Sequence, residues 1–126
     1  MNPSSQGRFD IAEKEDWLRY LDNNGYVIIK EVANSQERGQ AISLLWDFLE
    51  DMPGEAKYAV RRDDSVSWRN GSWFPSPRNG IANGYGMGQS KFLWYSRLLP
   101  KVSEAFRTIW GVESLLVSFD GGNVFR

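Results

Sequence analysis

The last third of the chain, residues 89–126, most constrains the fold, because it places two helices directly before an apolar strand. Pro100 has no amide hydrogen and fits the first position of a helix, so we expect the second helix to begin there and to end at Gly111. Residues 115–119 then alternate between apolar and polar positions, which predicts a strand buried on one face. Such a strand needs a sheet to lie in, so we expect the protein to continue past Arg126 into further strands. The apolar side chains at helical spacing around the proline are Leu98, Val102, Phe106, Ile109 and Trp110.

The chain begins with a polar stretch, and we expect residues 1–9 to be a disordered tail and residues 10–126 to be part of a single domain. Asp10 and Glu13 have the spacing of a capping box, so a helix should begin there, and Gly25 should end it. The side chains predicted to point inward from this helix are Trp17, Leu18 and Leu21.

A strand and a second helix should follow. Residues 26–32 are rich in β-branched side chains, which predicts a strand. Asn34, with Glu37 three residues later, predicts the start of a helix that ends near Met52. Its apolar positions are Ile42, Leu45, Trp46 and Leu49. No glycine-rich phosphate loop follows the strand, which argues against a doubly wound nucleotide-binding fold.

Residues 54–88 form a long connection with few regular patterns. Residues 58–60 predict a short strand, and residues 66–74 predict a hairpin with Asn70-Gly71 at its tip. Irregular connections of this length are uncommon in compact domains and often serve a function. The glycines of residues 84–88 lack the spacing and the preceding strand of a phosphate-binding loop.

Arginines and aromatic residues alternate in the same connection. This composition suits stacking of a sugar or of single-stranded nucleic acid. It equally suits tryptophans that pack the loop onto the domain while the arginines remain solvated. The residues are Arg61, Arg62, Trp68, Arg69, Trp73, Phe74, Arg78 and Tyr85.

Composition excludes several classes of function. The 126 residues are 41% hydrophobic and 25% charged with a net charge of −1, which disfavours a disordered chain, a membrane partner and a nucleic-acid partner. No stretch resembles a signal peptide or a membrane span, so we expect a cytoplasmic protein. The chain has no cysteine and no histidine, so it cannot supply a Ser-His or Cys-His pair, or the two histidines of a common iron site.

Several stretches resemble the phytanoyl-CoA dioxygenase-like family of non-haem iron(II), 2-oxoglutarate-dependent oxygenases. Residues 25–30 with the following helix resemble the opening of these proteins. Residues 88–94 and 116–121 resemble the middle of one branch, up to the strand before its iron site. The resemblance implies an α+β fold: leading helices plus the first strands of a double-stranded β-helix (jelly-roll or cupin-like) fold, ending before the metal-binding strands.

The resemblance also implies a function for the complete protein. It would use Fe(II) and 2-oxoglutarate to hydroxylate a small organic or acyl substrate, with succinate and CO₂ as products. The chain itself holds no catalytic or metal-binding residue in this interpretation and is expected to bind neither cofactor tightly alone. Its 2-oxoglutarate contacts would be Asn123, Ser118 and Arg126. Its substrate contacts would be Trp68, Trp73 and Tyr85, in a substrate lid formed by residues 61–88.

Two other interpretations remain open. A non-enzymatic binding module could use residues 61–88 to hold a glycan or single-stranded nucleic acid. A small interaction protein or pseudo-enzyme could be complete at 126 residues.

Overall fold

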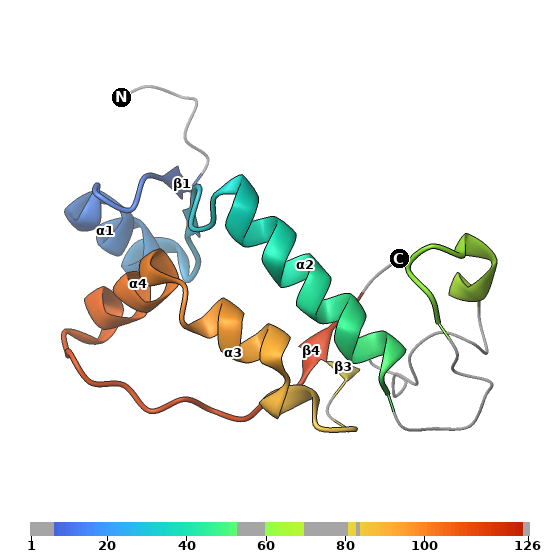
Figure 1. The fold of residues 1–126 in the computed structure, drawn as a ribbon. Helices are drawn as coiled ribbons and strands as arrows, with labels where there is room; N and C mark the ends of the chain where they lie inside the picture. The colour runs from blue at the N-terminus through green and yellow to red at the C-terminus, as the bar shows by residue number, and fades with distance from the viewer. Residues whose placement is uncertain (1–6, 53–59, 70–80, 83, 125–126) are drawn as a thin grey trace. The chain divides into compact units, whose positions relative to one another are not determined.

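The computed structural model describes residues 7–52, 60–69, 81–82 and 84–124 (Figure 1). The chain divides into two compact units. The first unit comprises Met1–Gln36 and Arg97–Leu116, and the second comprises Glu37–Ser96 and Val117–Arg126. None of the helices in the described ranges has both the length and the apolar character needed to cross a membrane.

The first unit contains two short strands and two helices. Strand β1 pairs in parallel with β2, so that Arg8 lies opposite Ile28. An ion pair of 3.0 Å between Lys14 and Glu104 joins the two helices. The elements are β1 (Arg8–Phe9), α1 (Lys14–Asn24), β2 (Ile28–Ile29) and α4 (Pro100–Trp110).

The prediction of a disordered tail over residues 1–9 is wrong at residues 8 and 9, which form β1. The carbonyl of Gly7 accepts a hydrogen bond of 2.7 Å from the backbone N–H of Ile28, and that of Phe9 accepts one of 2.8 Å from Lys30. The ring of Phe9 also packs against Tyr20, with centroids 5.4 Å apart. The predicted strand at residues 26–32 supplies the partner for this segment, and sequence periodicity cannot show such long-range pairing.

That strand is shorter than predicted, because only Ile28 and Ile29 lie within β2. Glu31 has φ 51, which lies outside the extended region and ends the strand. The carbonyl of Glu31 accepts a hydrogen bond of 3.0 Å from Nζ of Lys101 on α4.

Helix α1 confirms most of its predicted features. The backbone N–H of Asp10 donates to the carboxylate of Glu13, which is one half of the expected capping box, and the helix itself begins at Lys14. Gly25 ends it with φ 77, a left-handed conformation that glycine adopts without strain. Trp17 is 0% exposed, and its Nε1 donates a bond of 3.2 Å to the carbonyl of Ile11.

Helix α4 begins at Pro100 and ends before Gly111, which has φ 63, so both predicted boundaries are confirmed. Its apolar stripe, however, is largely exposed in this unit, with Trp110 at 68% and Phe106 at 54%. Leu98 and Ile109 are exposed as well.

The predicted strand at residues 115–119 is wrong. Residues 114–121 adopt no regular secondary structure, and Leu116 is fully exposed. In the second unit a two-residue strand, β4 (Gly122–Asn123), instead pairs antiparallel with β3 (Ile81–Ala82). In the described residues no strand lies beside residues 115–119 to bind their backbone groups, and alternation alone does not provide a partner.

The second unit is built on α2, which begins directly after Asn34 as predicted. Leu49 and Met87 form its buried core at 2% and 0% exposure. Ile42 is exposed, contrary to the prediction, whereas the other predicted apolar positions of the helix pack at the core. The further residues around this core are Leu45, Trp46, Phe48, Met52, Phe92, Leu93 and Val124. Besides the two strands, the elements are α2 (Ser35–Glu50), η2 (Ser65–Trp68), η3 (Met87–Gln89) and α3 (Lys91–Arg97).

The predicted hairpin at residues 66–74 is wrong in its first arm, because residues 65–68 form the 3₁₀ helix η2. Asp64 caps this helix by accepting a hydrogen bond of 3.0 Å from the backbone N–H of Val66. The expected Asn70-Gly71 tip and most of the expected strand at 58–60 lie outside the described residues. Val60 is described, is buried and belongs to no strand.

The observed mixture of helices and small sheets agrees with an α+β chain. The double-stranded β-helix that the family resemblance implies stays a prediction, because the two described sheets each contain two strands.

Gly88 marks a close approach between η3 and the segment before β4. A Cβ atom at Gly88 would lie 2.6 Å from the backbone oxygen of Asp120 and 3.1 Å from that of Phe119. Both neighbours are backbone atoms, so rotation of a side chain cannot make room for a methyl group. Gly84, four residues earlier, has open space around its Cβ position.

Gly88→Ala is therefore expected to destabilise the second unit by about 2 kcal/mol, the usual scale of overpacking. Gly84→Ala is the matched control and should change the free energy of unfolding by less than about 0.5 kcal/mol. Urea unfolding of the two variants measures this difference. Equal midpoints would contradict the close approach.

Candidate functional site

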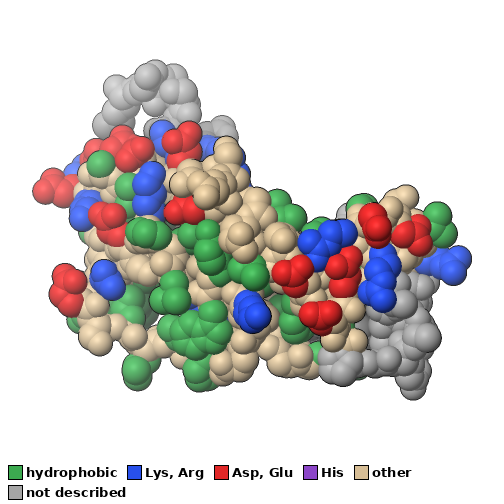
Figure 2. All heavy atoms as spheres, viewed as in Figure 1, with side chains coloured by type: hydrophobic (Ala, Val, Ile, Leu, Met, Phe, Trp, Pro, Cys, Tyr) green, Lys and Arg blue, Asp and Glu red, His purple; other side chains and the backbone are tan. Residues whose placement is uncertain are grey.

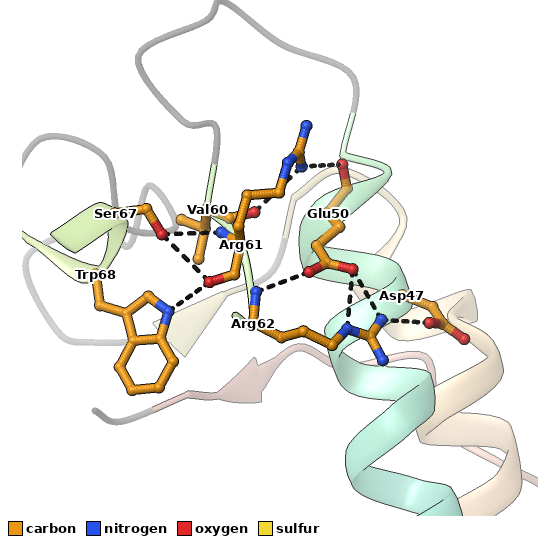
Figure 3. Close-up of polar contacts among 7 residues, drawn as sticks. All are labelled: Asp47, Glu50, Val60, Arg61, Arg62, Ser67 and Trp68. Carbon is orange, nitrogen blue, oxygen red and sulfur yellow. Dashed lines mark hydrogen bonds and ion pairs between the residues drawn. The ribbon is translucent and has the colours of Figure 1, made fainter. Parts of the chain in front are cut away.

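The C-terminal half of α2 and residues 60–69 meet through a group of charged side chains (Figure 3). The guanidinium of Arg62 donates to Glu50 through Nε at 3.0 Å and Nη2 at 2.8 Å. Nη2 also donates to Oδ1 of Asp47, one helical turn earlier, and the backbone N–H of Arg62 donates to Glu50 at 2.7 Å. One arginine thus binds two carboxylates of the same helix, and we call these three residues the arginine clamp. Figure 2 shows acidic and basic side chains mixed over this part of the surface.

Arg61 binds the end of the same helix through its backbone. Its Nη1 donates to the carbonyl of Glu50 at 3.3 Å and to that of Val60 at 3.2 Å. The last carbonyls of a helix have no partner within the helix and carry partial negative charge, so a guanidinium there is favourable. The last turn of α2 contains no basic residue of its own, and Arg61 supplies that charge from the next segment.

Trp68, a predicted substrate contact, is held by the arginine segment. Its Nε1 donates to the carbonyl of Arg61 at 2.7 Å, and its ring lies against Trp46 of α2 with centroids 5.3 Å apart. The hydroxyl of Ser67 accepts from the backbone N–H of Arg61 at 2.9 Å and donates to the carbonyl of Asp64 at 2.6 Å. In the described structure Trp68 therefore packs onto the domain, as the second interpretation of this loop predicted.

The clamp shifts the protonation of its members. The hydrogen bonds from Arg62, followed by its charge, hold the pKa of Glu50 below its ordinary value. Glu50, followed by Asp47, raises the pKa of Arg62 in turn. Both side chains remain partly exposed, so solvent screens the pair and its effect on overall stability is modest.

A second feature of α2 is a surface pocket of about 400 Å³ beside Tyr85, which we call the Tyr85 pocket. Tyr85 has φ 57, an uncommon left-handed conformation for a residue with a side chain, and it precedes Gly86, the N-cap of η3. Residues three and four apart share one face of a helix, and Leu44, Asp47 and Phe48 of α2 form such a set. Asp51 and Met52, which directly follow the helix, line the same pocket. The lining residues are Leu44, Asp47, Phe48, Asp51, Met52, Tyr85 and Lys91.

The two predicted aromatic contacts lie on different faces of α2. Trp68 packs on Trp46, whereas Tyr85 lines the pocket together with Phe48. Residues two apart on a helix are separated by roughly 160° around its axis. The structure therefore does not bring Trp68 and Tyr85 together on one wall, and Trp73 lies outside the described residues.

The predicted 2-oxoglutarate contacts lie near the end of the chain. The hydroxyl of Ser118 donates to Oδ2 of Asp120 at 3.0 Å, and Asn123 lies opposite Ile81 in β4. Ser118 and Asn123 are both exposed, and Arg126 lies outside the described residues. The backbone oxygens of the two residues after Ser118, Phe119 and Asp120, lie close to Gly88, which follows the core residue Met87.

The residues present do not fit an iron(II) site of two histidines and one carboxylate. The chain contains no histidine and no cysteine. In the described ranges no three acidic side chains gather closely enough to hold a metal ion.

Sequence reasoning did not find the arginine clamp or Lys91. Asp47 and Glu50 do stand three residues apart, which shows that they share a helix face. Their partner is more than ten residues further along the chain, and only the folded structure shows that Arg62, rather than a neighbouring arginine, reaches them.

Comparison with known proteins gives one distant similarity. The chain is 25% identical over 115 residues to a protein from Aspergillus versicolor named "Ava biosynthesis cluster protein O". The match covers 89% of this chain and 36% of that protein, so the chain spans about a third of its relative's length. No protein-family model matches the chain, and no solved structure matches it.

We expect Arg62→Met to raise the pKa of Glu50 toward its ordinary value of 4.5. Because the folded-state pKa of Glu50 is lowered, its contribution to stability is present above the unfolded-state pKa and is lost as the pH falls through the folded-state pKa. The variant should therefore lose less stability than the unmodified protein on acidification through this range.

NMR titration of the Glu50 carboxyl carbon and urea unfolding across the same pH range measure both effects. Arg19→Met is the control, since Arg19 pairs at 3.4 Å with the exposed Asp16 on α1 and should leave Glu50 unchanged. A pKa of Glu50 that is insensitive to Arg62→Met would contradict the clamp.

Proposed function

We propose that this chain is the N-terminal part of an iron(II), 2-oxoglutarate-dependent dioxygenase that hydroxylates a small organic or acyl substrate. The observation that carries the proposal is the similarity over 115 residues to a protein of a biosynthesis cluster, of which the chain covers 36%. A biosynthesis cluster is a natural setting for an enzyme that modifies a small molecule. The residues that resemble the phytanoyl-CoA dioxygenase-like family supply the reaction class.

The exposed apolar surface of the first unit supports the view that the complete protein is larger. Large apolar residues of α4 and of the segments directly before and after it face solvent in this unit. Extended apolar patches are rare on the surfaces of monomeric proteins and usually mark contacts with other protein surface. The residues are Leu98, Phe106, Ile109, Trp110, Val112, Leu115 and Leu116.

The metal ligands of the proposed enzyme would come from outside this sequence, since its own donor set does not fit iron. The chain's contribution would be to shape the site: Ser118 and Asn123 offer exposed polar groups for 2-oxoglutarate, and Tyr85 borders the Tyr85 pocket.

The charge around Trp68 favours this proposal over a module for single-stranded nucleic acid. Such a module needs a basic groove that follows the phosphates. Arg62 is instead bound to two carboxylates, and Asp63 and Asp64 follow it directly. The phosphates of a nucleic acid would therefore meet acidic side chains beside Arg62, which would repel them.

The proposal predicts different results for the 126-residue chain and for the complete gene product. The purified 126-residue chain should form no succinate from 2-oxoglutarate with iron(II), because it lacks histidine ligands. The complete gene product should form succinate and should contain a His-x-Asp pair after Arg126, with a later histidine and a nearby arginine or lysine. A complete gene product without the pair and without succinate formation would overturn the proposal.

Within the complete enzyme, Asn123→Ala should raise the 2-oxoglutarate concentration needed for half-maximal rate about tenfold, the loss of one hydrogen bond to a charged group. Steady-state rates across 2-oxoglutarate concentrations measure this. Asn24→Ala is the control: it removes an amide that binds the carbonyl of Tyr20 within α1, and it should leave the requirement unchanged. An unchanged requirement in Asn123→Ala with a lowered unfolding midpoint would make Asn123 a structural residue only.

A further inference from the structure

We infer that the Tyr85 pocket binds a zwitterionic small molecule with an apolar side group, such as an amino acid or a short peptide with an apolar residue. The inference rests on the proposed function in treating Tyr85 as a substrate contact. It extends that function by naming the chemical class of the ligand.

The wall of the pocket is apolar. Leu44 and Phe48 stand four residues apart on α2 and so share one face of the helix. Met52, two residues past the end of α2, extends this apolar strip, and Tyr85 borders the same space. Phe48 and Met52 also pack at the core of the second unit, which fixes the strip in place. An apolar group of a ligand that covers this strip would be removed from water, the main source of affinity in small-molecule sites.

Charges of both signs border this wall. Asp51 and Lys91 line the pocket, and within the described residues neither side chain forms a hydrogen bond or an ion pair. The third charged residue, Asp47, already binds Arg62 through Oδ1. The pocket therefore offers one acceptor for an ammonium group and one donor for a carboxylate.

The two charges favour a ligand that carries both complementary groups. An ammonium group is favoured beside the carboxylate of Asp51, and a carboxylate is favoured beside Lys91. A ligand with both groups gains from both contacts, whereas an amine or an acid alone gains from one.

Isothermal titration calorimetry with the 126-residue chain tests this inference without iron or 2-oxoglutarate. The probes are L-phenylalanine, the dipeptide Phe-Phe, 2-phenylethylamine (no carboxylate) and 3-phenylpropionate (no ammonium). The site is open and small, so we expect dissociation constants of about 1 mM for the better zwitterion. Whichever of the two zwitterions binds more tightly shows whether the pocket prefers a free amino acid or a peptide.

The variants Asp51→Asn and Lys91→Gln assign each charge. Each should weaken the better zwitterion about threefold to tenfold, the range for partly exposed charged contacts. Asp51→Asn should also weaken 2-phenylethylamine but not 3-phenylpropionate, and Lys91→Gln should do the reverse. The matched controls, Asp22→Asn and Lys30→Gln, alter exposed charges of the first unit and should leave all four affinities unchanged.

Absence of zwitterion binding at tens of millimolar would overturn the inference, as would equal loss in the control variants. Either result would leave the proposed oxygenase activity untouched, because that is judged by succinate formation in the complete protein. Conversely, zwitterion binding with the expected pattern would hold even if the complete protein formed no succinate.

Discussion

The packing of Leu49 against Met87 is the contact on which the second unit depends. These side chains are 2% and 0% exposed, and they join the C-terminal half of α2 to the short helix before α3. Burial of each contributes about 1.5–3 kcal/mol. Val124, the residue after β4, packs against the same cluster, so this core also contacts the segment that follows β4. The clamp and the Tyr85 pocket occupy positions that this core fixes, because both are built on the same half of α2.

Local signals in the sequence predicted the helices and several of their boundaries. Pro100 and Gly111 delimit α4 because each constrains its own backbone, whatever its surroundings. The strands were predicted less well. Residues 115–119 alternate as a strand should, yet the described structure gives them no partner, while residues 8–9 form a strand that no pattern indicated. Strand formation depends on long-range pairing, which a single sequence does not encode visibly.

The same distinction applies to the candidate site. The sequence identified Trp68 and Tyr85 as unusual, but it could not show that they lie on different faces of α2. It likewise showed several arginines without showing that Arg62 is neutralised by two carboxylates. Conversely, the missing histidines were evident from composition alone, and they exclude an iron site of two histidines and one carboxylate built from this sequence. Residue types can thus exclude a chemistry, whereas a binding site requires geometry.

Leu49 and Met87 form one core, and this core positions both the arginine clamp and the Tyr85 pocket. A double-mutant cycle with Leu49→Ala and Met87→Ala, followed by urea unfolding, measures whether the two side chains form one core. We expect the two losses of stability not to be additive, with a coupling free energy of about 1 kcal/mol, as residues in contact show. Losses that add to within about 0.3 kcal/mol would mean that the two side chains act independently, and would contradict the core described for this unit.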